Sequence, residues 1–163
     1  MKSLFLVRHA HAAQGHDDHG RALTTRGVRA AVRAGKHLAE AHCEPQVALL
    51  STAARVMQTW QYIQTELTAT PRVEAEHSLY LADPDSMHAQ LVSIPSSVEC
   101  VLLVAHNPGI SQFARWLTAA GPSQLVDRLE RGFAPGAAAW LTLRASAWSD
   151  VNARSAEIRG FWD

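Results

Sequence analysis

Three short segments of the chain place arginine and histidine side chains directly after apolar runs. These segments are Arg8–His11, Ser51–Arg55 and His106–Gly109. An arginine stays charged in a protein and presents a planar fork of N–H donors that matches phosphate oxygens. If the three segments meet, two arginines and two histidines form a strong phosphate site. No acidic residue lies close enough in the sequence to be an evident neutralising partner.

The apolar runs before these segments predict strands that bring them together. Leu4–Val7, Val47–Leu50 and Val101–Val104 are continuously apolar, which is typical of strands buried on both faces of a parallel sheet. Ligands of such sheets bind beyond the carboxyl ends of the strands. Because each segment follows one of these runs, we expect all three segments at the same edge of the sheet.

The rest of the chain alternates between helical and strand patterns. Four helices are predicted: one from a cap at Thr24 or Thr25 to about Ala39, one along the apolar stripe Val56–Leu67, one over Pro84–Val92 and one over Ile110–Leu117. Strands are predicted at Arg72–Glu76, Val98–Ala105, Ala137–Leu143 and Glu157–Phe161. This order predicts an α/β fold, a three-layer sandwich with a mostly parallel central sheet and helices on both faces. A chain of 163 residues without a repeat or linker is expected to form a single domain, residues 1–163.

Charge and composition exclude some classes of partner. Lys plus Arg and Asp plus Glu both number 15, so the formal net charge is zero. Binding to nucleic acid or to an anionic membrane is therefore not expected. The run before Arg8 is too short for a signal peptide and no run approaches a membrane span, so we expect a soluble cytoplasmic protein. Cys43 and Cys100 lack metal-site spacing and are expected to be reduced thiols.

The motifs together resemble those of a known family. Leu6–Ala10 is similar to the signature of the histidine phosphatase (phosphoglycerate mutase-like) superfamily, Ser51–Thr59 to its second element and Val104–Gly109 to its third. Arg21–Gly27 and the short chain resemble the SixA-type branch, the phosphohistidine phosphatases. The resemblance extends from about residue 4 to residue 143, with the motifs in the family's order.

This resemblance implies a role for each matching residue. His9 would be the nucleophile that becomes a transient phosphohistidine. Arg8 and Arg55 would hold the equatorial phosphoryl oxygens, and His106 would stabilise the same oxygens as an imidazolium or as an N–H donor. Arg21 would reach the rim of the pocket and bind phosphate. No metal and no other cofactor is expected, because the site already carries fixed positive charge.

Two departures from the family pattern bear on the substrate. Ala10 replaces the usual glycine, and His11 stands where SixA-like relatives often carry an acidic residue. Family members that cleave phosphate esters use a Glu or Asp to protonate the leaving alkoxide, and His77–Asp83 offers no match for it. The imidazole of a phosphohistidine needs less acid help. We therefore expect a phosphohistidine-bearing protein as substrate and partner, for example a phosphotransfer domain, with His11, Asp83 or water as the open choices of proton donor.

Three other functions fit parts of the sequence. A phosphomonoesterase of the same superfamily would act on small molecules. A zinc hydrolase could use the two histidines of His9–His11 with His106 and the His16–His19 segment, although Arg8 and Arg55 would repel a dication. A non-catalytic module could bind a phosphorylated group without turnover. Unless it holds zinc, His16–His19 is expected to be a solvated loop near the mouth of the site.

Overall fold

The strands that precede the three motifs lie side by side in one seven-stranded sheet. In the computed structural model, which describes all 163 residues, the order across the sheet is β3 (Arg72–Glu76), β2 (Val47–Ser51), β4 (Cys100–Ala105), β1 (Lys2–Arg8), β6 (Ala138–Leu143), β7 (Ala156–Trp162) and β5 (Thr118–Ala120). Only β6 runs antiparallel to its neighbours β1 and β7. The predicted mostly parallel sheet is confirmed.

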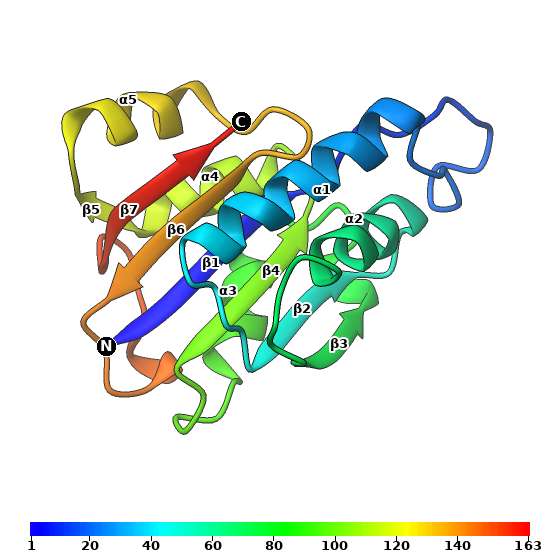
Figure 1. Cartoon of the computed structure of the whole chain (residues 1–163). Helices are drawn as coiled ribbons and strands as arrows, with labels where there is room; N and C mark the ends of the chain where they lie inside the picture. The colour runs from blue at the N-terminus through cyan, green and yellow to red at the C-terminus, as the bar shows by residue number, and fades with distance from the viewer.

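Helices cover both faces of this sheet. The helices α1 (Thr25–Glu40) and α2 (Ala54–Gln64) pack together on one face, and α3 (Pro84–Val92) and α4 (Gly109–Leu117) lie on the other (Figure 1). A fifth helix, α5 (Ser123–Arg131), packs against α4 and β7, and two single-turn helices, η1 (His77–Leu79) and η2 (Trp148–Asp150), complete the chain. The arrangement is the predicted three-layer α/β sandwich. No helix combines the length and the apolar character needed to cross a membrane.

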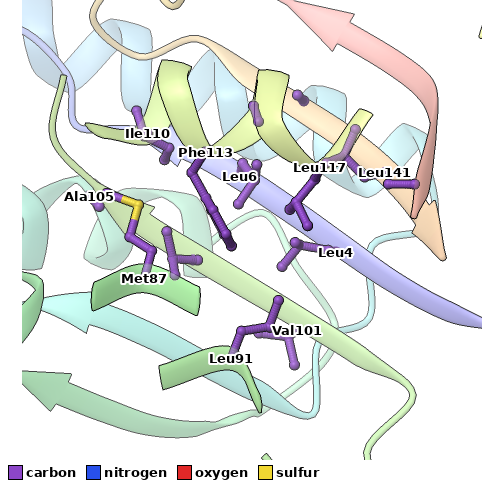
Figure 2. Packing of buried hydrophobic residues seen from close by; sticks show 14 of the residues in the cluster. Leu4, Leu6, Met87, Leu91, Val101, Ala105, Ile110, Phe113, Leu117 and Leu141 are labelled. Carbon is purple, nitrogen blue, oxygen red and sulfur yellow. The ribbon is translucent and has the colours of Figure 1, made fainter. Parts of the chain in front are cut away.

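Alternate residues of the central strands enter two separate cores. In β1, Leu4 and Leu6 belong to the larger cluster under α3 and α4, whereas Phe5 and Val7 belong to the cluster under α1 and α2. Figure 2 shows Leu4 and Leu6 pointing toward Phe113 of α4. Because side chains of a strand alternate between faces and both faces are covered here, every position must be apolar. This explains the continuous apolar run.

Several element boundaries agree with the sequence patterns. The strand Arg72–Glu76 and the helix Pro84–Val92 have the predicted bounds. Thr24 rather than Thr25 is the N-cap of α1, since its hydroxyl oxygen accepts a hydrogen bond from the Gly27 N–H at 3.1 Å. A cap of this kind satisfies a helix N–H that has no partner within the helix.

Other boundaries differ from the predictions. The helix α5 and the short strand β5 are absent from the prediction, because α5 buries only Leu129 and carries too few apolar residues to form a clear stripe. The helix α2 ends at Gln64, so Leu67 lies beyond it, although Leu67 still packs against the core. The strand β4 begins at Cys100 rather than Val98.

Two glycines allow close backbone approach beside the motif segments. A Cβ at Gly27 would lie 2.1 Å from the backbone oxygen of His11, and a Cβ at Gly109 would lie 1.9 Å from the backbone oxygen of Ala82. Both distances are shorter than atoms can tolerate, so any side chain would displace the start of α1 or of α4. These contacts set where each helix begins relative to the edge of the sheet.

Truncating the core under α4 should lower stability strongly. Phe113 is completely buried, so Phe113→Ala leaves a cavity, and we expect the free energy of unfolding to fall by about 3–5 kcal/mol. The adjacent residue Gln112 is exposed, and Gln112→Ala should change it by less than about 0.5 kcal/mol. Urea unfolding followed by circular dichroism measures both. Similar losses in the two variants would contradict the assigned packing.

Candidate active site

The carboxyl ends of β1, β2 and β4 bring the predicted residues into one pocket. Arg8 pairs with Ala105 in the register of β1 and β4, so the residues that follow, His9 and His106, become neighbours. Their ring centroids lie 5.2 Å apart. Arg55 enters from the first turn of α2, directly after β2. The pocket has a volume of about 390 Å³ and is lined by all five predicted site residues, Arg8, His9, Arg21, Arg55 and His106.

Two hydrogen bonds determine which nitrogen of His9 carries its proton. The Nδ1 atom lies 2.8 Å from the backbone oxygen of Ala10, which can only accept, so Nδ1–H donates. The Nε2 atom accepts from Nε–H of Arg55 at 3.3 Å. Burial lowers the pKa of His9 to about 4, against the effect of the Ala10 hydrogen bond, and the charges of Arg55 and Arg8 lower it further. At neutral pH, Nε2 therefore carries no proton, and its lone pair is held only by the 3.3 Å contact with Arg55, which a phosphoryl group must displace before Nε2 can attack.

Arg55 is a buried cation with most of its donors engaged. Its side chain is 2% exposed. Besides His9, its Nη2 contacts Nδ1 of His106 at 3.3 Å and Oδ2 of Asp18 at 3.2 Å, and its Nη1 donates to the backbone oxygen of Asp18 at 2.7 Å. A buried guanidinium needs such partners to offset the loss of its hydration. Arg55 therefore connects both histidines to the loop that carries Asp18.

The Gln-Thr pair that follows Arg55 in the second motif holds neighbouring loops. The hydroxyl of Thr59 donates to the backbone oxygen of Arg55 at 2.7 Å and accepts from the Ala10 N–H at 3.0 Å. Gln58 Oε1 accepts from the Leu23 N–H at 2.7 Å. These bonds join α2 to the segment after His9. The pair therefore supports the position of the site rather than entering it.

His106 is completely buried and is oriented by Ser51. Its Nε2 lies 2.6 Å from Oγ of Ser51, which also accepts from the Ala53 N–H at 3.3 Å. Burial lowers the pKa of His106 to about 3, and the His9 and Arg55 charges act in the same direction. Nδ1 faces Arg55. Because a guanidinium can only donate, Nδ1 accepts from Arg55 Nη2, and a neutral His106 carries its proton on Nε2 and donates it to Ser51 Oγ. A bound dianion would favour a second proton, on Nδ1.

Arg8 has an unused donor in the pocket wall. Its Nη1 donates to the backbone oxygen of Phe133 at 2.8 Å, whereas its Nε is buried without a hydrogen-bond partner. Burial lowers the pKa of Arg8. Asn107 donates to the same Phe133 oxygen at 3.0 Å and also lines the pocket. The Arg8 side chain lines the pocket, so its charge is suited to attract an anion, whereas its unpartnered Nε has no exposed surface.

Asp18 corrects one expectation from the sequence. Its carboxylate contacts Arg55, Arg21 at 3.0 Å and the hydroxyl of Tyr80, so the pocket does contain a neutralising acidic residue. The His16–His19 loop is largely exposed near the mouth of the pocket, as predicted, and it brings this side chain into the pocket lining. The Tyr80 hydrogen bond is the main cause that lowers the pKa of Asp18 to about 2.

Comparison with known proteins agrees with this arrangement. The family model described as histidine phosphatase superfamily, branch 1, matches residues 4–79. An uncharacterized protein of Mycobacterium leprae is 33% identical over 145 residues, which cover 88% of this chain and 87% of that protein. The chain belongs to the histidine phosphatase superfamily. It is therefore a phosphatase, as the resemblance predicted.

Solved structures assign this histidine phosphatase to the SixA-type branch. The candidate phosphohistidine phosphatase SixA of Nakamurella multipartitia is 31% identical, with a TM-score of 0.86 over 99% of this chain and 95% of that one. The corresponding candidate protein of Agrobacterium tumefaciens is 25% identical, with a TM-score of 0.81 over 99% of this chain and 97% of that one. A structure of SixA with tungstate shares the fold. It is 22% identical, with a TM-score of 0.75 over 98% of this chain and 95% of that one.

The residues considered as proton donors occupy different places in this histidine phosphatase. His11 lines the pocket and its Nδ1 lies 2.8 Å from the hydroxyl of Thr24. Asp83 instead caps α3 by accepting from the Ser86 N–H at 2.8 Å, and this hydrogen bond lowers its pKa. No three His, Cys, Asp or Glu side chains are grouped so that they could hold a metal ion.

Three residues that shape the site are missing from the set predicted from the sequence. Ser51 belongs to a predicted motif without a role of its own, although its position at the end of a buried strand is a usable signal. Asp18 and Tyr80 are 62 residues apart and have no pattern that links them. Their contact depends on how the loop after β1 folds over the edge of the sheet.

The neutral histidines predict a particular dependence of stability on pH. A histidine ordinarily has a pKa of 6.5, whereas the pKa of His9 in the folded protein is about 4, so between these pH values the unfolded chain binds more protons. The free energy of unfolding should therefore fall as the pH is lowered from about 6.5 to about 4, with His106 acting in the same direction. Denaturant titrations across this range measure the slope. We expect His9→Asn to make it shallower, and an unchanged slope would contradict a neutral buried His9.

Proposed function

We propose that this histidine phosphatase hydrolyses phosphohistidine in a partner protein, through a covalent phosphohistidine on His9, without a metal, and as one domain over residues 1–163. The observation that carries the proposal is the state of His9. Its Nδ1 proton is held by the Ala10 oxygen, and its unprotonated Nε2 contacts Arg55 at 3.3 Å in a pocket lined by Arg8 and Arg55. A neutral, oriented imidazole is the form that can attack phosphorus.

The first step transfers the phosphoryl group to His9. The Nε2 lone pair forms the new bond to phosphorus, while the bond from phosphorus to the leaving nitrogen breaks and its electron pair stays on that nitrogen. The transition state spreads charge over three equatorial oxygens. In this proposal the guanidinium groups of Arg55 and Arg8, which line the pocket, hold two of them. His106 holds the third once it is protonated on Nδ1, and Arg21 binds at the rim.

The second step releases phosphate by attack of water on the phosphorylated His9. The departing ring must leave as a neutral imidazole, which requires that its Nδ1 proton stay in place. The Ala10 carbonyl holds that proton, with 2.8 Å between Nδ1 and the carbonyl oxygen. The same contact that exposes Nε2 for attack therefore also makes His9 a good leaving group.

The pocket supports an imidazole leaving group better than an alkoxide. An alkoxide needs a proton from a protonated acid. Asp18 is the one carboxylate that lines the pocket, and its pKa of about 2 leaves it ionised. The SixA proteins of Nakamurella multipartitia and Agrobacterium tumefaciens are candidate phosphohistidine phosphatases, which supports the same substrate class. Exposed Leu81 at the rim allows a side chain of another protein to approach.

Removing the nucleophile should abolish turnover, and removing metals should not. We expect wild-type enzyme to release phosphate from a phosphohistidine-bearing protein equally well with and without EDTA, whereas His9→Ala releases none above background. His42 lies beyond α1, outside the pocket, so His42→Ala is the matched control and should keep full activity. Phosphate release is measured colorimetrically. Activity lost to EDTA would indicate the zinc hydrolase instead, and binding without release would indicate a phospho-binding module.

Removing the central cation should weaken both binding and rate. Arg55→Ala deletes donors to the phosphoryl oxygens, and we expect kcat to fall about 10²–10³-fold with a raised KM. Arg72→Ala, which removes an exposed arginine at the start of β3, should leave both constants unchanged. Steady-state kinetics on the same phosphoprotein measure them. Equal residual activity in Arg55→Ala and His9→Ala would contradict the separate roles of the two residues.

A further inference from the structure

Asp18 places a negative charge in a pocket whose arginines would attract an anionic substrate. Its side chain is 49% exposed, and three donors hold it: Arg21 Nε at 3.0 Å on Oδ1, and Arg55 Nη2 at 3.2 Å and the Tyr80 hydroxyl on Oδ2. Nη2 of Arg21 also lies 3.0 Å from Oδ1, so Arg21 is the only residue on this oxygen, and a ligand can replace one of its two contacts. The nearby negative charge repels a phosphoryl dianion. Asp18 offsets part of this cost by balancing the buried charge of Arg55, and its place in the pocket lining suits it to contact the substrate as well.

The position of Asp18 is fixed next to the phosphoryl site. Nη1 of Arg55 donates to the backbone oxygen of Asp18 at 2.7 Å, so the main chain itself is held at the pocket. Nη2 of Arg55 contacts both Asp18 Oδ2 at 3.2 Å and His106 Nδ1 at 3.3 Å. The carboxylate therefore borders the place where the phosphoryl oxygens bind and lies on the loop side of Arg55.

The protonation of Asp18 decides which chemistry is open to it. Its pKa of about 2 means that it carries no proton at neutral pH and cannot act as an acid toward an alkoxide. An ionised carboxylate can only accept hydrogen bonds and favour a nearby cation. Its useful partner is therefore an N–H group on the substrate.

The leaving imidazole of a phosphohistidine provides such a group. One ring nitrogen is bonded to phosphorus, and the other carries either a lone pair or a proton. If it carries a lone pair, cleavage of the P–N bond leaves an imidazolate anion. If it carries a proton, the ring is a cation before cleavage and leaves as a neutral imidazole, with the bonding electron pair on the departing nitrogen.

We propose that Asp18 sets the specificity of this phosphatase for phosphohistidine by accepting the N–H of the leaving imidazole and keeping that proton on the ring while the P–N bond breaks. The proposal rests on the proposed function. Asp18 acts on the substrate ring as the Ala10 carbonyl acts on His9, so each imidazole that leaves phosphorus has an acceptor for its distal N–H.

Tyr80 is the positioning residue for this acceptor. Its hydroxyl donates to Asp18 Oδ2, and its ring packs edge-on against His106 at 5.5 Å and His19 at 4.9 Å. The Arg55 guanidinium carbon lies 6.0 Å from the centre of the same ring. Tyr80 comes from the segment after β3 in which no acidic residue could be matched. The segment thus contributes to leaving-group chemistry through Asp18 and not through an acid of its own.

Two substrates with different leaving groups test the role of Asp18. A phosphohistidine peptide has a leaving group that must keep a proton, whereas 4-nitrophenyl phosphate releases a stable phenolate that needs none. We expect Asp18→Asn to lower kcat/KM on the peptide about 10- to 100-fold more than on the aryl phosphate. The deficit should shrink as the pH falls and the free phosphohistidine ring takes up its own proton. Tyr80→Phe should change the same ratio and pH profile in the same direction, but less.

Asp17 provides a matched control in the same loop. Its side chain is exposed and lies outside the pocket, so Asp17→Asn makes the same charge change without touching the site, and neither rate should change. Equal losses on both substrates in Asp18→Asn would overturn the proposal, because Asp18 would then only support Arg55. A faster reaction on the peptide would also overturn it and show that Asp18 obstructs the pocket. A wild-type enzyme that cleaves the aryl phosphate but not the peptide would instead refute the proposed function itself.

Discussion

The site is organised around one buried charge, the guanidinium of Arg55. A cation with 2% of its side chain exposed has lost its hydration and must be compensated by acceptors within the protein. Its partners are the ring nitrogens of His9 and His106 and two oxygens of Asp18. The position of each group is therefore coupled to the others. An arriving phosphoryl group enters a set of donors that is already oriented.

Burial keeps both histidines neutral, and the charge of Arg55 acts in the same direction. The pKa of His9 is about 4 and that of His106 about 3. The cation that attracts an anionic substrate therefore also helps to keep a proton off Nε2 of His9. A site that used carboxylates to balance its arginines at every contact would weaken both effects, and here a single half-exposed carboxylate is present.

Control of proton position is the second theme of the pocket. The Ala10 carbonyl fixes the proton of His9 on Nδ1, and in His106 the Ser51 hydroxyl accepts from Nε2–H because Nδ1 accepts from Arg55. Neither contact supplies a proton to a leaving group. This is consistent with chemistry in which the departing atom is one ring nitrogen of an imidazole and the other ring nitrogen already holds a proton.

The sequence alone determined the parts of this protein that depend on local pattern. Strands covered on both faces must be apolar at every position, so the runs at Leu4–Val7 and Val101–Val104 reveal a parallel sheet and the edge where its ligands bind. Arg8, Arg55 and His106 could be placed together because each closely follows such a run. Asp18, Tyr80 and Ser51 could not be assigned roles in this way. Their roles come from contacts across 37 to 62 residues of chain, and the loop after β1 is held by these distant partners as well as by hydrogen bonds among its own residues.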